Sequence, residues 1–202
     1  RARLVLAGLQ PGQRQHARRA GRRGGGGLAG FPDTRAEQGF EADDGCDPPD
    51  APLPIDPARF TLVHTGTLTH GTRDPARLLA AVDRVCALGA LDPGQIEIWL
   101  VGRHLDVARR SLADWPRLVP AVRLVPLVDR ATALDAQRRA TVLVVLGTPD
   151  LRHAGAVTTK VFEYLHARRP ILAIGAPEGA LADLLASTGG GTVASTTDEV
   201  VA

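Results

Sequence analysis

The chain has 202 residues, of which 44% are hydrophobic, and its formal net charge at pH 7 is +2. This length suits one well-packed core with an appendage and excludes two full enzyme domains. No apolar run approaches the roughly 18 residues of a membrane span, and the near-neutral body gives no support to nucleic-acid binding, so we expect a soluble protein without a nucleic-acid partner.

The first 57 residues are expected to form a poorly structured segment and a linker. Positions 1–32 carry seven arginines and no acidic residue, and positions 24–27 are all glycine. This composition buries too little apolar surface to offset the entropy of ordering, although a basic arm for nucleic acid is the functional alternative. Positions 43–57 are rich in Asp and Pro, which is typical of an extended linker. One domain is therefore expected over positions 58–202, with order beginning at Phe60.

Two further features of composition bear on the origin of the chain. It contains no methionine, even at position 1, which leads us to expect a fragment or a processed product. Cys46 and Cys86 show neither metal-ligand spacing nor a disulfide framework, which favours a reducing compartment such as the cytoplasm.

From Phe60 onward, apolar strand patterns alternate with amphipathic helix patterns. The strands are expected at 60–64, 96–101, 122–125, 141–146, 171–174 and 192–194. The helices between them are expected at 74–86, 104–114, 129–139, 158–165 and 178–186, with another helix starting where the chain ends. This alternation predicts an α/β fold with a doubly wound, mostly parallel sheet. Ligands of such sheets bind beyond the carboxyl ends of the strands, where Gly66, Gly102, the loop 147–159 and Gly175 should gather.

The predicted helix at 158–165 is expected to carry the chemistry. Its apolar residues recur at helical spacing, while Lys160 and Glu163 share the other face. A cation in the first turn is unfavourable by roughly 0.3–1 kcal/mol unless an anion meets it. With capping hydroxyls from Thr158 and Thr159 and the free N–H groups, Lys160 makes a site for a phosphate or pyrophosphate, and Glu163 is placed to accept hydrogen bonds from ribose. The alternative is a solvated i,i+3 ion pair between Lys160 and Glu163, worth about 0.2–0.5 kcal/mol.

Several other site types lack their signatures. The turn after the first strand has no G-x-G-x-x-G and the second strand does not end in an acidic residue, which disfavours a dinucleotide-binding domain for hydride transfer. No Walker P-loop is present, which disfavours a P-loop nucleotide-binding domain. A response-regulator-like domain needs an acidic cluster where this chain has His64, Thr65 and Gly66. No Ser/His/Asp or Cys/His set is recoverable, so hydrolase readings have little support, and no metal site is expected.

Several motifs, taken in order, resemble the C-terminal half of retaining glycosyltransferases of family 4, which have the GT-B fold. They are His-Thr-Gly-Thr-Leu at 64–68, Arg-Asp-Pro at 73–75, Leu-Val-Gly at 100–102, Thr-Lys-Val-Phe-Glu-Tyr-Leu at 159–165 and Arg-Pro-Ile-Leu at 169–172. The resemblance covers the chain from Phe60 to its end and extends weakly to 38–44. It implies a Rossmann-like domain that binds a nucleotide-diphosphate sugar as substrate, with no cofactor.

The resemblance also implies roles for individual residues. Lys160 and Arg73 would neutralise the donor pyrophosphate, the Gly66 backbone would approach it closely, and Glu163 would hold the ribose. The donor-binding residues it implies are Gly66, Thr67, Arg73, Thr159, Lys160 and Glu163; no catalytic residue is assigned. His64 is interpreted as a packed strand-end histidine, and a phosphate role for Arg73 is weighed against a surface arginine that flanks a helix.

The chain departs from the family pattern in two ways. The family's paired glutamates stand eight positions apart, and the first position is Gly155 here, so we expect sugar recognition to rely on neighbours such as Thr158 or His153. The acceptor domain that would precede this one is missing, so we expect no catalysis by this chain alone. The expected acceptor is a glycan or a lipid-linked molecule at the inner face of a membrane. A non-catalytic nucleotide- or phosphate-binding module of the same fold is the alternative.

Overall fold

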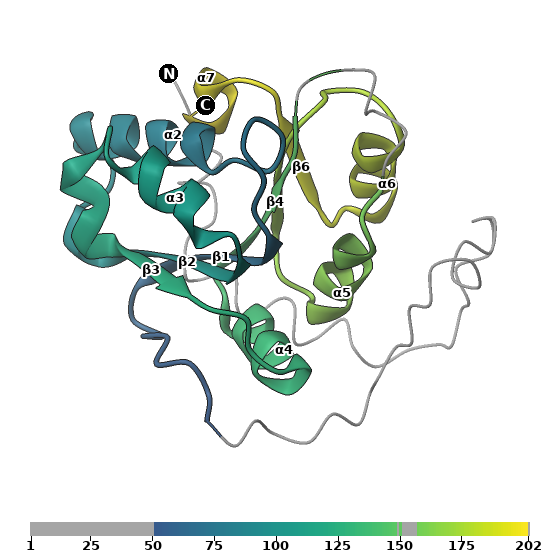
Figure 1. Ribbon diagram of the computed structural model, residues 1–202. Coiled ribbons are helices and arrows are strands. Elements are labelled where there is room, and N and C mark those ends of the chain that lie inside the picture. The colour runs from purple at the N-terminus through teal and green to yellow at the C-terminus, as the bar shows by residue number, and fades with distance from the viewer. Residues whose placement is uncertain (1–50, 149, 151–156, 202) are drawn as a thin grey trace.

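The computed structural model describes residues 51–148, 150 and 157–201. Six strands form one sheet in which every neighbouring pair is parallel (Figure 1). The strands are β1 (Phe60–Thr67), β2 (Ile96–Arg103), β3 (Val122–Val125), β4 (Val142–Leu146), β5 (Ile171–Ile174) and β6 (Gly191–Ala194). Their order in space is β3-β2-β1-β4-β5-β6. The doubly wound parallel sheet predicted from the sequence is confirmed.

Helices cover both faces of this sheet (Figure 1). One face carries α2 (Ala76–Ala87), α3 (Leu105–Leu112) and α7 (Thr197–Val201). The other face carries α4 (Arg130–Arg139), α5 (Thr159–Ala167) and α6 (Ala180–Thr188). Two short 3₁₀ helices, η2 (Pro93–Gln95) and η3 (Pro116–Ala121), lead into β2 and β3. Parallel neighbours cannot be joined by a tight turn, so each crossover packs back onto the sheet as a helix.

Strand β4 shows how the sequence specifies burial on both faces. Val142, Val144 and Leu146 belong to the core under α2, α3 and α7, whereas Leu143 and Val145 belong to the core under the other three helices. Successive side chains of a strand point to opposite faces, so a strand covered on both faces must be apolar throughout. The unbroken apolar run at this position is therefore the signature of a central strand.

The bounds of β3 and β5 agree with the sequence analysis, whereas β1 and β2 are longer than expected. These two strands stay paired to their ends, with Gly66 opposite Gly102 and Thr67 opposite Arg103. The segments expected to be turns after both strands are therefore partly strand. At the other end of the chain α7 covers Thr197–Val201, where the start of a helix was expected, and Val200 is fully buried.

The segment before β1 contains no helix or strand from 51 to 57, but it packs on the domain. Ile55 is only 3% exposed and joins the core under α4, α5 and α6. The guanidinium of Arg139 on α4 donates to the carbonyl of Leu53 over 2.8 Å and to that of Ile55 over 2.7 Å. The expectation that order begins at Phe60 is therefore wrong, because a side chain more than eighty residues downstream holds the segment in place.

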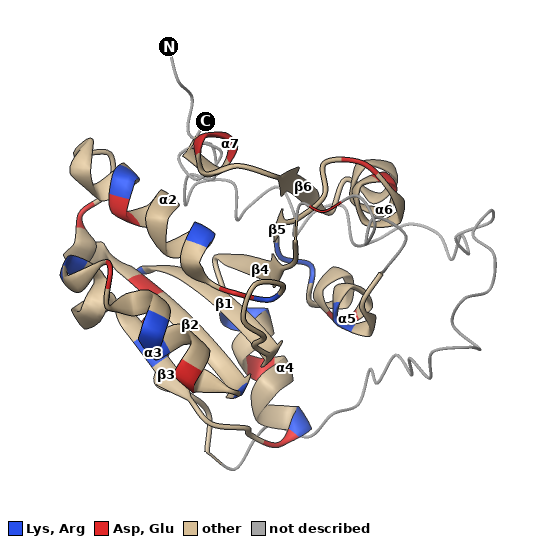
Figure 2. Cartoon of the chain, turned by 45° about the horizontal axis from the view of Figure 1, so that its top comes forward, with Lys and Arg blue, Asp and Glu red and all other residues tan. Residues whose placement is uncertain are grey.

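Charges of both signs are interspersed along α2 and α3 (Figure 2). Arg84 on α2 pairs with Asp198 on α7, and Arg117 Nε lies 2.7 Å from Asp83 Oδ1. Both arginines are about half exposed, and ion pairs of this kind contribute about 1 kcal/mol or less each. Of these two pairs, only Arg84–Asp198 joins α7 to α2, so this attachment depends chiefly on apolar contacts such as those of the buried Val200.

Candidate functional site

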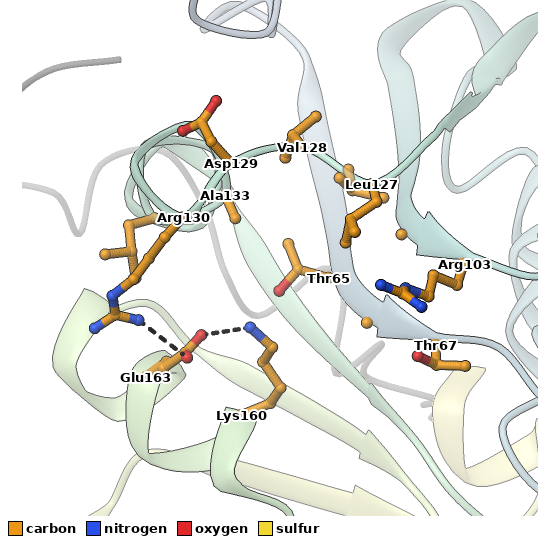
Figure 3. Close-up of a pocket in the computed structure, with 14 residues that line it drawn as sticks. Thr65, Thr67, Arg103, Leu127, Val128, Asp129, Arg130, Ala133, Lys160 and Glu163 are labelled. Atoms are coloured by element: carbon orange, nitrogen blue, oxygen red, sulfur yellow. Dashed lines mark hydrogen bonds and ion pairs between the residues drawn. The ribbon is translucent and has the colours of Figure 1, made fainter. Parts of the chain in front are cut away.

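A pocket of about 400 Å³ opens at the carboxyl edge of the sheet. The ends of β1 and β2 form its floor, the segment 127–130 and α4 form one wall, and the start of α5 forms another (Figure 3). At this edge β1 and β4 are neighbours, although the chain winds away from them in opposite directions. Ligands of doubly wound sheets bind at such a switch point.

Two glycines lie opposite each other on the floor of the pocket. Gly66 and Gly102 have φ angles of 155° and 142°, which L side chains rarely adopt. A Cβ on Gly102 would overlap the carbonyl of Gly66, whereas a Cβ on Gly66 would lie 3.4 Å from the His64 ring. Gly102 is thus required for the close approach of β2 to β1, and Gly66 presents bare backbone to the pocket.

Beneath the floor, Thr65 connects β1 to two helices. Its backbone N–H donates to the hydroxyl of Tyr164 on α5 over 2.8 Å, and its Oγ1 accepts from Nε2 of Gln137 on α4 over 3.0 Å. All three side chains are buried. Burial raises the pKa of Tyr164 to about 12, so the phenol stays protonated at neutral pH. This network fixes the α4 and α5 walls to the floor.

The α5 wall carries an ionic cluster centred on Glu163 (Figure 3). Lys160 Nζ lies 2.8 Å from Glu163 Oε2, and Arg130 Nη1 lies 3.4 Å from Oε1. Gln137 Nε2 donates to Oε2 over 3.2 Å. The i,i+3 ion pair weighed as the alternative in the sequence analysis therefore forms, but its two members also line the pocket. The Glu163 side chain is 13% exposed, against 39% for Lys160, so the carboxylate is the fixed partner.

The N-terminus of α5 differs in one detail from the expectation. Thr158 precedes the helix with extended backbone, and its side chain makes no capping hydrogen bond. The prediction that its hydroxyl caps the helix is therefore wrong. The N–H of Val161 instead donates to the backbone carbonyl of Thr158 over 3.1 Å. The positive end of the helix dipole still favours an anion at this first turn.

Of the six donor-binding residues expected from the sequence, four lie together in the structure. Gly66, Thr67, Lys160 and Glu163 line the pocket, whereas Arg73 and Thr159 do not. Thr159 is exposed at the first position of α5.

Arg73 lies in the turn after β1, where its backbone exchanges two hydrogen bonds with Thr69. Its side chain is exposed.

His64 lies just below the floor with only 7% of its surface exposed. Its Nδ1 is 2.9 Å from the carbonyl of Val144, so Nδ1 carries the proton and Nε2 is a bare acceptor. Nε2 has no hydrogen-bond partner among the described residues. Burial lowers the pKa of His64 to about 4, and the charges of Arg73 and Lys160 act in the same direction. The ring is therefore neutral at pH 7, in agreement with the packed-histidine interpretation.

His153, which was weighed for sugar recognition, and Gly155, which replaces the family's first glutamate, both lie outside the described residues. Within the ranges that the structure describes, no three His, Cys, Asp or Glu side chains are grouped as metal ligands would be. In those same ranges no helix has the length and apolar character needed to cross a membrane.

The comparison with solved structures identifies proteins of the same fold. WaaG, a glycosyltransferase involved in lipopolysaccharide biosynthesis, is 17% identical and superposes with a TM-score of 0.55 over 72% of this chain and 36% of that one. HepE from Anabaena, solved with UDP-glucose, is 14% identical with a TM-score of 0.52 over 70% of this chain and 37% of that one. The N-terminal domain of trehalose-6-phosphate phosphatase from Candida albicans is 12% identical with a TM-score of 0.53 over 71% and 33%.

The chain shares its fold with part of WaaG and part of HepE. It spans little more than a third of the length of WaaG and HepE. At the level of sequence, no protein-family model and no curated protein matches the chain.

Three side chains that the sequence analysis did not select belong to the site. Arg103 lines the pocket from the last residue of β2, and Arg130 and Gln137 reach Glu163 from α4. Gln137 carried a usable signal, since it stands three residues after Leu134 on the face of α4 that the structure buries. An amide in an apolar stripe needs a partner, and that need points to a polar group on the neighbouring helix.

Proposed function

We propose that this chain is the donor-binding, C-terminal half of a retaining glycosyltransferase of the GT-B class, related to family 4. One observation carries the proposal: Lys160 and Glu163, from successive turns of one helix, face the same pocket as the bare backbone of Gly66. A cation, a helix N-terminus and a carboxylate at the switch point of a parallel sheet suit a nucleoside diphosphate. The shared fold with WaaG and HepE agrees with this proposal.

In this proposal the diphosphate lies at the N-terminus of α5. Lys160, the hydroxyl of Thr159 and the first-turn N–H groups bind it there, and Arg73 approaches it from the turn after β1. Negative charge grows on the diphosphate as the bond from the sugar carbon to the phosphate oxygen breaks. Fixed positive groups stabilise that charge more in the transition state than in the ground state, which lowers the barrier. The proposal assigns no metal ion and no cofactor.

Glu163 is proposed to hold the ribose hydroxyls. Lys160 is paired with this carboxylate in the structure, at 2.8 Å. The Lys160 side chain is 39% exposed, so it can rotate to the diphosphate when the donor enters. Arg130 and Gln137 still contact the carboxylate after that rotation, so the loss of the ion pair does not leave Glu163 without donors.

The sugar and the acceptor are assigned only as classes. We propose transfer of a hexose or related sugar to a glycan or lipid-linked acceptor, in the cytoplasm at the inner membrane surface, together with an acceptor domain that precedes this one. Because the chain spans 36% of WaaG, we expect it to bind the donor but not to complete the transfer by itself.

The first test is a thermal-shift panel on the full chain with UDP, GDP and ADP, with NAD as the comparator. A nucleotide at a hundred times its dissociation constant should stabilise the folded chain by about 2.7 kcal/mol. Stabilisation by one nucleoside diphosphate would name the base. Stabilisation by NAD alone would contradict the proposal. A chain that binds a nucleoside diphosphate but never transfers a sugar, even with an acceptor domain joined to it, would be the non-catalytic module.

The second test removes the cation. Lys160→Ala should weaken binding of the selected nucleoside diphosphate by more than about tenfold, or about 1.4 kcal/mol, because a charged contact to the diphosphate is lost. The matched control is Arg110→Ala, which removes an exposed helical ion pair with Asp106 on α3 and no part of the pocket. Equal affinities for Lys160→Ala and the wild type, measured by calorimetry, would contradict the proposal that the diphosphate binds at the N-terminus of α5.

A further inference from the structure

The side chain of Gln137 is a fully buried amide beneath the pocket, with 0% of its surface exposed. Its Nε2 donates to Thr65 Oγ1 over 3.0 Å and to Glu163 Oε2 over 3.2 Å. Its Oε1 has no hydrogen-bond partner among the described residues. Burial of an amide with one end unpaired is costly, so a glutamine in this position needs a reason. The structure supplies one, since the amide joins the floor of the pocket to the carboxylate on its wall.

The orientation of this amide is determined by its partners. An ionised carboxylate can only accept hydrogen bonds, whereas a hydroxyl can accept or donate. If the amide were turned around, its carbonyl oxygen would face Glu163 Oε2, and two acceptors would repel each other. The NH₂ group must therefore face Glu163, with its second hydrogen directed at Thr65.

The three donors to Glu163 differ in their freedom to move. The side chains of Lys160 and Arg130 are 39% and 48% exposed, so both reach the carboxylate from solvent. Gln137 reaches it from the protein interior and is also bonded to β1. A ligand that attracts Lys160 leaves Gln137 in place, so the amide is the donor that defines where the carboxylate lies.

We infer that Gln137 is a positioning residue for ribose recognition: it holds Glu163 where the ribose hydroxyls of a nucleoside diphosphate meet its carboxylate. The inference rests on the proposed function and extends it to a residue that contacts no ligand itself. A carboxylate held in its binding geometry before the ligand arrives loses less conformational entropy on binding. Without Gln137, the Glu163 carboxylate loses its donor from the protein interior and, among the described residues, keeps its contacts with the half-exposed Arg130 and the partly exposed Lys160.

The experiment compares nucleotides with and without ribose hydroxyls on the full chain. Its probes are UDP, GDP and ADP, each paired with its 2′,3′-dideoxy analogue, and inorganic pyrophosphate. The measured quantity is the dissociation constant of the dideoxy analogue divided by that of the ribonucleotide. In the wild type the ribonucleotide should bind at least about tenfold more tightly than the dideoxy analogue, because hydrogen bonds to a charged group are lost. Gln137→Met, which keeps the volume and removes the amide, should lower this ratio by about fivefold or more, with pyrophosphate binding changed less than about twofold.

Two controls separate positioning from general loosening. Tyr164→Phe removes a hydroxyl from the same network at Thr65 but no hydrogen bond to Glu163, so it should lower the ratio clearly less than Gln137→Met does. In a Glu163→Ala background, Gln137→Met should lower the ratio no further, because the residue acts through that carboxylate. Gln137→Leu serves as a second variant if Gln137→Met does not fold.

The outcomes distinguish the inference from the proposal beneath it. A wild-type chain that binds none of the three nucleoside diphosphates overturns the proposed function and the inference with it. A chain that binds a nucleoside diphosphate but keeps its wild-type ratio in Gln137→Met and Gln137→Leu overturns the inference alone. An equal loss of the ratio in Tyr164→Phe also overturns it, since the effect would then be a general loosening.

Discussion

The floor of the pocket and its α5 wall are held by different kinds of interaction. The floor depends on backbone contact and burial, with Gly66 opposite Gly102 and the Thr65 network beneath them. The wall depends on charges, with Glu163 mostly covered and Lys160 partly in solvent. Steric overlap of atoms or an unpaired buried polar group lowers the free energy of unfolding by several kcal/mol, whereas an exposed ion pair contributes about 1 kcal/mol or less. Changes in the floor should therefore affect folding, and changes in the wall should affect ligands.

The largest effect is expected at Gly102. A Cβ there would overlap the Gly66 carbonyl, and φ of 142° is unfavourable for alanine. Overpacking and backbone strain together should lower the free energy of unfolding by about 3–5 kcal/mol in Gly102→Ala. Urea denaturation measures this change. Gly175→Ala is the matched control, because among the described residues its Cβ would meet only the Thr148 carbonyl, at 3.7 Å, and it should shift stability by less than about 1 kcal/mol. Equal losses in the two variants would show that β1 and β2 can separate without cost.

The next effect is a pH dependence from His64, under the same floor. Its pKa is lowered from 6.5 to about 4 in the folded chain, so the unfolded chain binds more protons between these values. Stability from this group is complete above about pH 6.5 and is lost as the pH falls towards 4, by about 3 kcal/mol in all.

Urea denaturation at pH 7, 5.5 and 4.5 tests this dependence. His64→Gln retains a donor for the Val144 carbonyl but does not titrate. The variant should lose less stability than the wild type across this range. If the free energies of unfolding of the wild type and the variant fall equally with pH, the protonated imidazole must move out of its buried site into solvent.

The sequence predicts features of the floor and the wall that depend on local pattern. The strand at 122–125, the strand at 171–174 and the helix with Lys160 and Glu163 on one face follow from side-chain periodicity over a few residues. Gly66 and Gly102 were placed at the same sheet edge because parallel strands bring their carboxyl ends together.

The partners of these residues could not be predicted in the same way. Gln137 contacts Thr65 across 72 positions, and Arg139 holds the backbone of Leu53 across 86. Which side chain of α4 reaches β1 or α5 depends on how that helix packs on the sheet, and no local pattern encodes its rotation. Even next to a helix, the sequence does not determine every hydrogen bond. A threonine before a helix can cap it, but the side chain of Thr158 makes no capping hydrogen bond.

The smallest change in stability is expected at Lys160, the residue with the largest proposed effect on binding. Lys160→Ala removes an i,i+3 ion pair between a partly exposed lysine and a mostly covered glutamate, and such helical pairs are worth about 0.2–0.5 kcal/mol. It also removes a cation from the first turn of α5, where the helix dipole disfavours it by about 0.3–1 kcal/mol. These terms oppose each other, so the free energy of unfolding should change by less than about 0.5 kcal/mol in urea without nucleotide. A decrease in the free energy of unfolding above about 1 kcal/mol would show that the ion pair stabilises the fold. The wall would then contribute to folding as the floor does. A small change together with a more than tenfold loss of nucleotide affinity would mean that Lys160 is retained for the ligand, because the helix itself is no less stable without it.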